Sequence, residues 1–173
     1  MTVTRICLTA MGTALFVVLS LCLQVPVFEN YYLCLGYVAM MVFCYYWGPW
    51  DGTVVGTLGV VIYCLLISGL RGLPGWAAGN LVIGIAVGLT CRATGNMKNL
   101  WLRHLILTAA IIASTAVGIL GVKSLVEVIL YAQPMAFRVA KNIYAFVADV
   151  VVMLASIPVC MSLGSTVQKY FPQ

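Results

Sequence analysis

The sequence predicts an all-α membrane protein, a six-transmembrane-helix bundle with both termini in the cytoplasm. Hydrophobic residues make up 64% of the 173 residues and charged residues make up 8%, whereas about a quarter of a soluble domain is charged. The mean hydropathy is +1.10. The few charges separate six apolar stretches of about 20 residues, the length that crosses the hydrocarbon core of a bilayer. We therefore expect one integral membrane domain over residues 1–173.

The first two helices are expected near residues 6–24 and 31–48. The first fills the uncharged stretch between Arg5 and Glu29. A cleaved signal peptide would also begin with a cation and an apolar run. No small-x-small cleavage site follows, however, so we expect this helix to remain in the protein. The second helix ends at the turn "WGPWDG", where adjacent Gly and Pro residues break a helix.

The next two helices are expected near residues 52–69 and 76–92. Asp51 stands at the start of the first of them, and no charge follows until Arg71. The connecting stretch "SGLRGLPGW" contains three glycines and a proline, which favour a loop. Small residues four apart let helices approach closely. We expect internal packing for the pairs Gly52 and Gly56, Gly75 and Gly79, and Gly84 and Gly88.

The last two helices are expected near residues 102–121 and 141–166. The first begins at the basic stretch "WLRH". The second begins at Lys141 and Asn142 and then runs into apolar residues that contain one acid, Asp149. The intervening residues 128–137 are too few to span a bilayer and include Pro134. We expect them to form an interfacial or re-entrant segment at the mouth of the last helix.

Basic residues indicate the orientation of the bundle through the positive-inside rule. The loop "RATGNMKNLWLRH" is the densest in basic residues. Placing it in the cytoplasm puts five cations inside against four outside, and both termini inside. The five are Arg5, Arg92, Lys98, Arg103 and Lys169. Anionic lipid at the inner face accounts for part of the net charge of +5, so this charge does not call for a nucleic-acid partner.

The sequence carries no signature of an enzyme, a metal site or a cofactor. It has no Gly-Lys dipeptide, hence no P-loop for ATP, and no G-x-S-x-G or H-E-x-x-H motif. The seven cysteines include no C-x-x-C pair, and within apolar stretches Cys acts as a small apolar residue. The single histidine, His104, offers little for a metal. Any uphill import must therefore draw on an ion gradient or on a partner.

A polar stripe on the last helix is the main candidate for a ligand site. With about 3.6 residues per turn, the residues on one face are Arg138, Asn142, Ala145 and Asp149. Acids inside a membrane are costly and usually face a bundle interior or a site. The stripe is typical of a pocket that opens outward, with pairing of Asp149 to a Ser, Thr or Tyr as the structural alternative.

The other walls of this pocket are expected from the outer ends of neighbouring helices. Asn80 lies one turn after Trp76 in the helix near 76–92, and aromatic walls with a few polar groups are typical of small-ligand sites. Cations near the mouth favour an anionic ligand, although contact with lipid headgroups explains Arg138 and Lys141 equally well. The remaining candidates for substrate binding are Tyr37, Arg71, Lys141 and Tyr144.

Three features together resemble the substrate-binding S component of an energy-coupling factor (ECF) type vitamin importer. Ala10 and Ala14 form an Ala-x-x-x-Ala pattern in the first helix, the pattern with which this family docks its transmembrane coupling subunit. The "GPWDG" turn resembles the family's "GP" turn after helix two. The stretch "FRVAKNIYAFVADVVVMLASIPV" resembles its last helix, which often opens with an Arg-x-x-Lys-Asn-like run. The pattern is closer to the folate and pantothenate type than to the biotin type.

This resemblance implies a transport subunit of the bacterial plasma membrane without an ATPase of its own. Such a subunit binds a vitamin or related micronutrient from outside with high affinity. It then docks on a coupling subunit that carries two ATPases, topples in the membrane and releases the vitamin inside. Ala10 and Ala14 are the docking residues that the resemblance implies. The sequence does not name the vitamin.

Two other classes stay open on the sequence alone. The first is a non-transporting membrane scaffold, which would leave the outer charges without a pocket. The second is a stand-alone ion-coupled transporter. That class is often built from inverted repeats with broken midplane helices. No repeat is visible here, and Pro158 is the only proline in the middle of a predicted helix.

Overall fold

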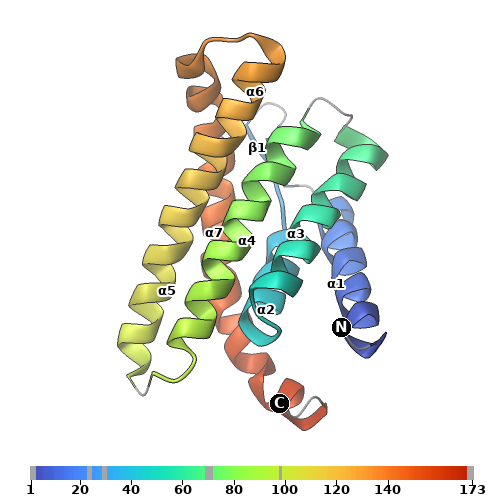
Figure 1. Cartoon of the computed structure of the whole chain (residues 1–173), viewed down its shortest axis with the longest axis vertical. Coiled ribbons are helices and arrows are strands. Elements are labelled where there is room, and N and C mark those ends of the chain that lie inside the picture. Colours follow the sequence, from blue (N-terminus) through green and yellow to red (C-terminus); the bar gives the residue numbers. More distant parts are fainter. Residues whose placement is uncertain (1–2, 23–24, 29–30, 69–71, 98, 171–173) are drawn as a thin grey trace.

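The computed structural model describes residues 3–22, 25–28, 31–68, 72–97 and 99–170. Its helices lie side by side in a bundle (Figure 1). The elements, in chain order, are α1 (Val3–Cys22), β1 (Val25–Phe28), β2 (Tyr31–Leu33), α2 (Gly36–Tyr46), α3 (Pro49–Tyr63), the π-helix η1 (Cys64–Ser68), α4 (Leu73–Thr94), α5 (Leu100–Thr115), the π-helix η2 (Ala116–Lys123), α6 (Ser124–Tyr131) and α7 (Met135–Tyr170).

Five helical stretches within the described residues are long and apolar enough to cross a membrane. They are Val3–Cys22, Pro49–Ile67, Leu73–Thr94, Leu100–Tyr131 and Met135–Gly164. The sixth helix, α2, has 11 residues. The predicted fold class, an all-α membrane protein built as a six-helix bundle, is confirmed. The start of α1 and the end of α7 lie toward the same end of the bundle (Figure 1).

The segment between α1 and α2 differs from the prediction. The helix expected near 31–48 begins only at Gly36, because the residues before it form an antiparallel hairpin in which Val25 lies opposite Leu33. The two strands are rich in Val, Phe and Tyr, residue types that are enriched in strands. Pro26 also lacks the backbone N–H that a helix interior requires.

The connection into the last helix also differs from the prediction, because residues 128–137, expected as an interfacial or re-entrant segment, are divided between two long helices. The rod α5–η2–α6 continues to Tyr131, and α7 begins at Met135. The three residues between them make a sharp reversal in which Ala132 has a left-handed φ of 50°. Pro134 stands directly before α7, at the turn rather than inside a helix.

Glycines allow α3 and α4 to pack closely, as predicted. A Cβ atom on Gly88 would lie 2.3 Å from the Cα atom of Pro49, and one on Gly84 would lie 2.7 Å from the Cα atom of Thr53. Contacts this short exclude any side chain. The other expected glycines, Gly52, Gly56, Gly75 and Gly79, also face neighbouring segments within the bundle.

An ion pair holds α1 against the start of α3. The Arg5 Nε donates to Asp51 Oδ2 at 2.8 Å, and the Thr9 hydroxyl donates to Asp51 Oδ1 at 3.0 Å. The Asp51 side chain is fully buried, so the cation and the hydroxyl compensate a charge that would otherwise be costly. The Arg5 guanidinium also donates to the carbonyl of Trp47 at 2.9 Å, which ties α1 to the turn between α2 and α3.

Candidate functional site

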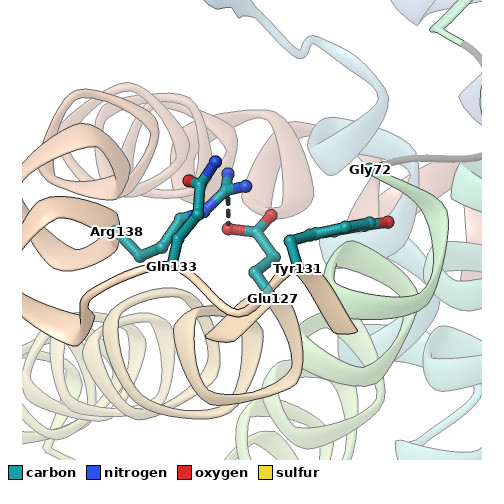
Figure 2. A pocket seen from close by; sticks show the side chains of 5 residues that line it. All are labelled: Gly72, Glu127, Tyr131, Gln133 and Arg138. Atoms are coloured by element: carbon teal, nitrogen blue, oxygen red, sulfur yellow. Dashed lines mark hydrogen bonds and ion pairs between the residues drawn. The ribbon is translucent and has the colours of Figure 1, made fainter. Parts of the chain in front are cut away.

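A pocket lies at the end of the bundle opposite the start of α1. It has a volume of about 420 Å³ and is lined by Gly72, Glu127, Tyr131, Gln133 and Arg138. These residues come from the beginning of α4, from α6, and from the reversal and first turn of α7 (Figure 2). Volumes of about 300–1,000 Å³ are typical of small-molecule sites.

The reversal between α6 and α7 creates the polar wall of this pocket. The Ala132 N–H donates to the carbonyl of Val128 at 2.9 Å, and the Arg138 N–H donates to that of Pro134 at 3.2 Å. Glu127 and Tyr131 are four residues apart on α6 and so share a face. The reversal brings Arg138 across from that face (Figure 2).

Glu127 is the centre of the polar contacts at the pocket. The Arg138 guanidinium lies 3.5 Å from Glu127 Oε2, and the Asn142 side-chain amide donates to the same oxygen at 3.2 Å. Asn142 also donates to the Ser124 hydroxyl at 2.9 Å. Two residues of α7 therefore hold the Glu127 carboxylate in place. The Glu127 side chain is almost fully buried.

Two buried polar atoms of the pocket wall have no hydrogen-bond partner among the described residues. They are the Nε of Arg138 and the Oε1 of Gln133. Buried polar groups in proteins are nearly always hydrogen-bonded, so an unpaired donor and an unpaired acceptor beside one pocket indicate where a ligand can bind. The Arg138 guanidinium also lies 5.4 Å from the centre of the Tyr131 ring, a distance that allows a cation–π contact.

Below the pocket lie two further buried charged side chains, Lys123 and Asp149. Lys123, the last residue of η2, interacts electrostatically with Glu127 and with the Asp149 carboxyl group on α7. Its ammonium group lies 5.9 Å from the centre of the Trp76 ring on α4. The side chains of Lys123 and Asp149 are both buried. Each of the two acids near this end of the described structure, Glu127 and Asp149, therefore has a cation as a partner.

A hydrogen-bond network continues from this pair into the bundle. Asp149 interacts with the Tyr37 hydroxyl, which donates to Asn80 Oδ1 at 2.7 Å. The Trp76 indole N–H donates to the same hydroxyl at 2.9 Å. The Asn80 amide in turn donates to the carbonyl of Gly56 on α3 at 3.0 Å. The network connects α2, α3, α4 and α7 directly beneath the pocket.

The polar stripe predicted on the last helix does face the bundle. Asn142 and Asp149 are buried, and Arg138 and Ala145 are partly buried. Only Arg138 lines the pocket itself, whereas Asn80, Asn142 and Asp149 pair with protein groups behind its wall. The alternative raised for Asp149, pairing with a tyrosine, matches its contact with Tyr37.

The structure places the other candidates differently. Tyr37 and Trp76 belong to the buried network. Lys141 is exposed, with its ammonium group 5.0 Å from the centre of the Phe137 ring, and Tyr144 is 42% exposed on the same side of α7. Lys141 and Tyr144 therefore stand outside the pocket wall. Arg71 lies outside the described residues.

Sequence reasoning missed Lys123, Glu127, Tyr131 and Gln133 as site residues. Lys123 and Glu127 are four residues apart, and this spacing is a signal of a shared face. The π-helical η2 ends at Lys123 and precedes Glu127, and each residue that a π turn adds rotates the side chains after it by about 100°. Helical-wheel reasoning from residue 102 onward therefore cannot place them. Gln133 lies in a reversal that the sequence did not predict.

The face of α1 that carries Ala10 and Ala14 points away from the bundle. Both alanines are exposed, whereas Thr9, Thr13 and Phe16 are buried against neighbouring helices. This exposure excludes packing of the Ala-x-x-x-Ala face inside the bundle. The face is available to another protein or to lipid.

A helical membrane bundle with a polar pocket of this size has the form of a membrane-embedded small-molecule site. Comparison with known protein families identifies the family of this chain. The chain matches the family described as ECF-type riboflavin transporter, S component, over residues 1–163, and it belongs to that family. No curated protein matched the chain in a direct search. This family is the riboflavin type of S component, whereas the sequence pattern resembled the folate and pantothenate type.

Family membership decides among the classes that the sequence left open. The chain is a substrate-binding S component of an ECF importer and a multi-pass membrane protein. Neither a non-transporting scaffold nor a stand-alone ion-coupled transporter is consistent with that assignment. The predicted resemblance to an S component is confirmed.

Proposed function

We propose that this protein captures riboflavin, or a closely related heteroaromatic vitamin, from outside the cell in the pocket between α4, α6 and α7. One observation supports this most strongly. A pocket of about 420 Å³ with unpaired polar atoms in its wall lies in a chain that belongs to the riboflavin S component family.

The chemistry of the pocket wall suits such a ligand. Tyr131 supplies an aromatic surface, and aromatic rings stack on flat heteroaromatic systems. Arg138 and Gln133 supply a donor and an acceptor that lack partners among the described residues. Riboflavin carries ring carbonyls, a ring N–H and a chain of hydroxyls, so it can satisfy both atoms. Binding would then remove the cost of leaving them unpaired.

In this proposal the buried network supports the pocket from behind. Asn142 positions the Glu127 carboxylate, and Tyr37, Asn80 and Trp76 connect the helices beneath. Rigid support of this kind keeps binding groups in place before the ligand arrives. Asn80, Asn142 and Asp149 therefore act on affinity mainly through the residues that they hold.

In this proposal the two ends of the bundle lie on opposite sides of the membrane. The pocket faces the outside, and the start of α1 and the end of α7 face the cytoplasm of a bacterial cell. The exposed face around Ala10 and Ala14 docks on a transmembrane coupling subunit, because small side chains allow two helix backbones to approach closely. Two ATPases bound to that subunit supply the energy.

Mass spectrometry of the purified protein tests the proposed ligand. The protein is expressed in cells grown with riboflavin, purified in detergent and denatured, and the released small molecules are identified. We expect riboflavin in an amount close to one molecule per protein. A control preparation of an unrelated membrane protein, purified in the same way, should release none. Release of a different vitamin would contradict the riboflavin assignment and keep the binding role.

A further inference from the structure

The described residues that line the pocket carry one charge of each sign. Among the described residues that line the pocket, Arg138 is the only cation and Glu127 the only anion. Two further cations lie near this end of the described structure. Lys123, behind the pocket wall, interacts electrostatically with both Glu127 and Asp149, and Lys141 is exposed over the ring of Phe137.

The negative charge of Glu127 is fixed in position whether or not a ligand is present. Its Oε2 receives the Asn142 amide at 3.2 Å and the Arg138 guanidinium at 3.5 Å. Asn142 is held in turn by its 2.9 Å bond to Ser124. The side chain of Glu127 is only 6% exposed. A carboxylate with so little contact to water acts strongly on any charge that enters the pocket.

The contact between Arg138 and Glu127 leaves Arg138 with capacity for a ligand. The distance of 3.5 Å between the guanidinium and Glu127 Oε2 is longer than the distance of about 2.7–2.9 Å that is usual for a tight charge-assisted hydrogen bond. The Nε of Arg138 has no partner among the described residues. A neutral carbonyl or hydroxyl oxygen can accept from Nε without disturbing the ion pair.

We infer that Glu127 determines the charge specificity of the pocket, so that it binds its ligand in a neutral, hydroxyl- or imide-bearing form and disfavours the phosphate ester. The inference rests on the proposed function and names the form of the ligand that the site accepts. It opposes the expectation, drawn from the sequence, that cations at the mouth favour an anionic ligand. A phosphate group beside Arg138 would approach a second, immobile negative charge.

The test compares two ligands that differ only in a terminal phosphate group. Riboflavin is neutral, and riboflavin 5′-phosphate carries the same ring and chain with an anionic group at the end. Both are fluorescent, so quenching measures each dissociation constant on the purified protein in detergent. The quantity of interest is the Kd for the phosphate divided by the Kd for riboflavin. A change in general binding strength affects both ligands and cancels in this ratio.

Three variants isolate the role of Glu127. Glu127→Gln keeps an oxygen that can accept from Asn142 but removes the charge. We expect the ratio to fall about tenfold or more, because one unit charge near the ligand has been removed. Arg138→Gln removes the cation and should raise the ratio by a similar factor. Lys141→Gln removes a cation three residues further along α7, on the exposed side, and should leave the ratio within about twofold.

The outcomes separate the inference from the proposed function. If the wild-type protein binds riboflavin but Glu127→Gln and Arg138→Gln leave the ratio unchanged, the inference is wrong and the proposed function stands. Equal shifts in Arg138→Gln and Lys141→Gln would also overturn it, since net charge alone would explain them. If Glu127→Gln fails to fold, Glu127→Asp replaces it: the shorter side chain withdraws the carboxylate from Arg138, so the ratio should fall, and an unchanged ratio would overturn the inference. A folded wild-type protein that binds neither ligand would contradict both.

Discussion

The Tyr37 hydroxyl donates a 2.7 Å hydrogen bond to Asn80 Oδ1 at the centre of the bundle. Both residues were expected to touch a ligand, yet both are fully buried and bond to each other. The bond joins α2 to α4, and the indole of Trp76 adds a third group at the same hydroxyl. This polar centre therefore holds the helices that carry the pocket.

Removing the Tyr37 hydroxyl should destabilise the protein. In Tyr37→Phe, the amide oxygen of Asn80 and the indole N–H of Trp76 lose a buried partner. We expect a loss of about 1–3 kcal/mol in the free energy of unfolding, measured by denaturant titration in detergent. Val147→Leu is the control, because Val147 is exposed on α7. Equal stability of the two variants would show that the network contributes nothing.

Removing the Asn142 amide should weaken ligand binding. In Asn142→Leu, Glu127 and Ser124 both lose the hydrogen bond that the Asn142 amide donates. Glu127 is then held less firmly in the pocket wall. We expect riboflavin affinity to fall by on the order of 1–3 kcal/mol, measured by calorimetry. Asn80→Leu should act in the same direction through Tyr37.

Val147→Leu is the control for these two variants, since Val147 is exposed on α7. Calorimetry is paired with a thermal melt, so that unfolded protein is not mistaken for weak binding. Unchanged affinity in both folded asparagine variants would remove the site from this end of the bundle.

A large residue on the exposed face of α1 should block docking without affecting the pocket. Ala10→Trp and Ala14→Trp each place a bulky side chain where a partner helix would approach. We expect riboflavin affinity near that of the wild type in detergent, together with loss of co-purification with the coupling subunit and loss of uptake in cells.

Thr13→Trp provides the contrast to the docking variants, because Thr13 is buried against the bundle. Overpacking there should lower stability by roughly 1–3 kcal/mol and reduce ligand binding as well. Full uptake by the two alanine variants would mean that this face docks nothing.

Breaking the Arg5–Asp51 pair should loosen α1 at the end far from the pocket. In Asp51→Ala, Arg5 loses the buried carboxylate that receives its guanidinium. Arg5 is partly exposed, so water replaces part of the interaction, and we expect a loss of about 1–2 kcal/mol. Thermal melts measure it. Riboflavin affinity should stay unchanged, and a large drop would show that the two ends are coupled.

Much of the fold follows from the sequence because charges are so few. Each uncharged stretch of about 20 residues has only one stable arrangement in a bilayer, since a helix satisfies its own backbone groups. The inward stripe on α7 follows from regular helical periodicity. The hairpin before α2 was not predicted, because apolar Val, Phe and Tyr residues satisfy a helix and a strand equally well by composition.

The site was less predictable than the fold, for two physical reasons. The π-helical η2 rotates Lys123 and Glu127 relative to a regular helix, so their inward direction is not visible in the spacing. The reversal between α6 and α7 depends on the left-handed backbone conformation of Ala132. A sequence predicts this conformation mainly where it has glycine or asparagine. Without that reversal, Gln133 and Arg138 cannot be placed on one pocket.

Titration of the purified wild-type protein with riboflavin, followed by fluorescence quenching, tests the central claim most directly. We expect saturable binding of one riboflavin per protein, weakened in Arg138→Gln, whose side chain lines the pocket, and unchanged in Lys141→Gln. Absence of saturable quenching with protein that melts cooperatively would contradict the assignment of riboflavin. Binding that Arg138→Gln leaves intact would contradict the location of the site.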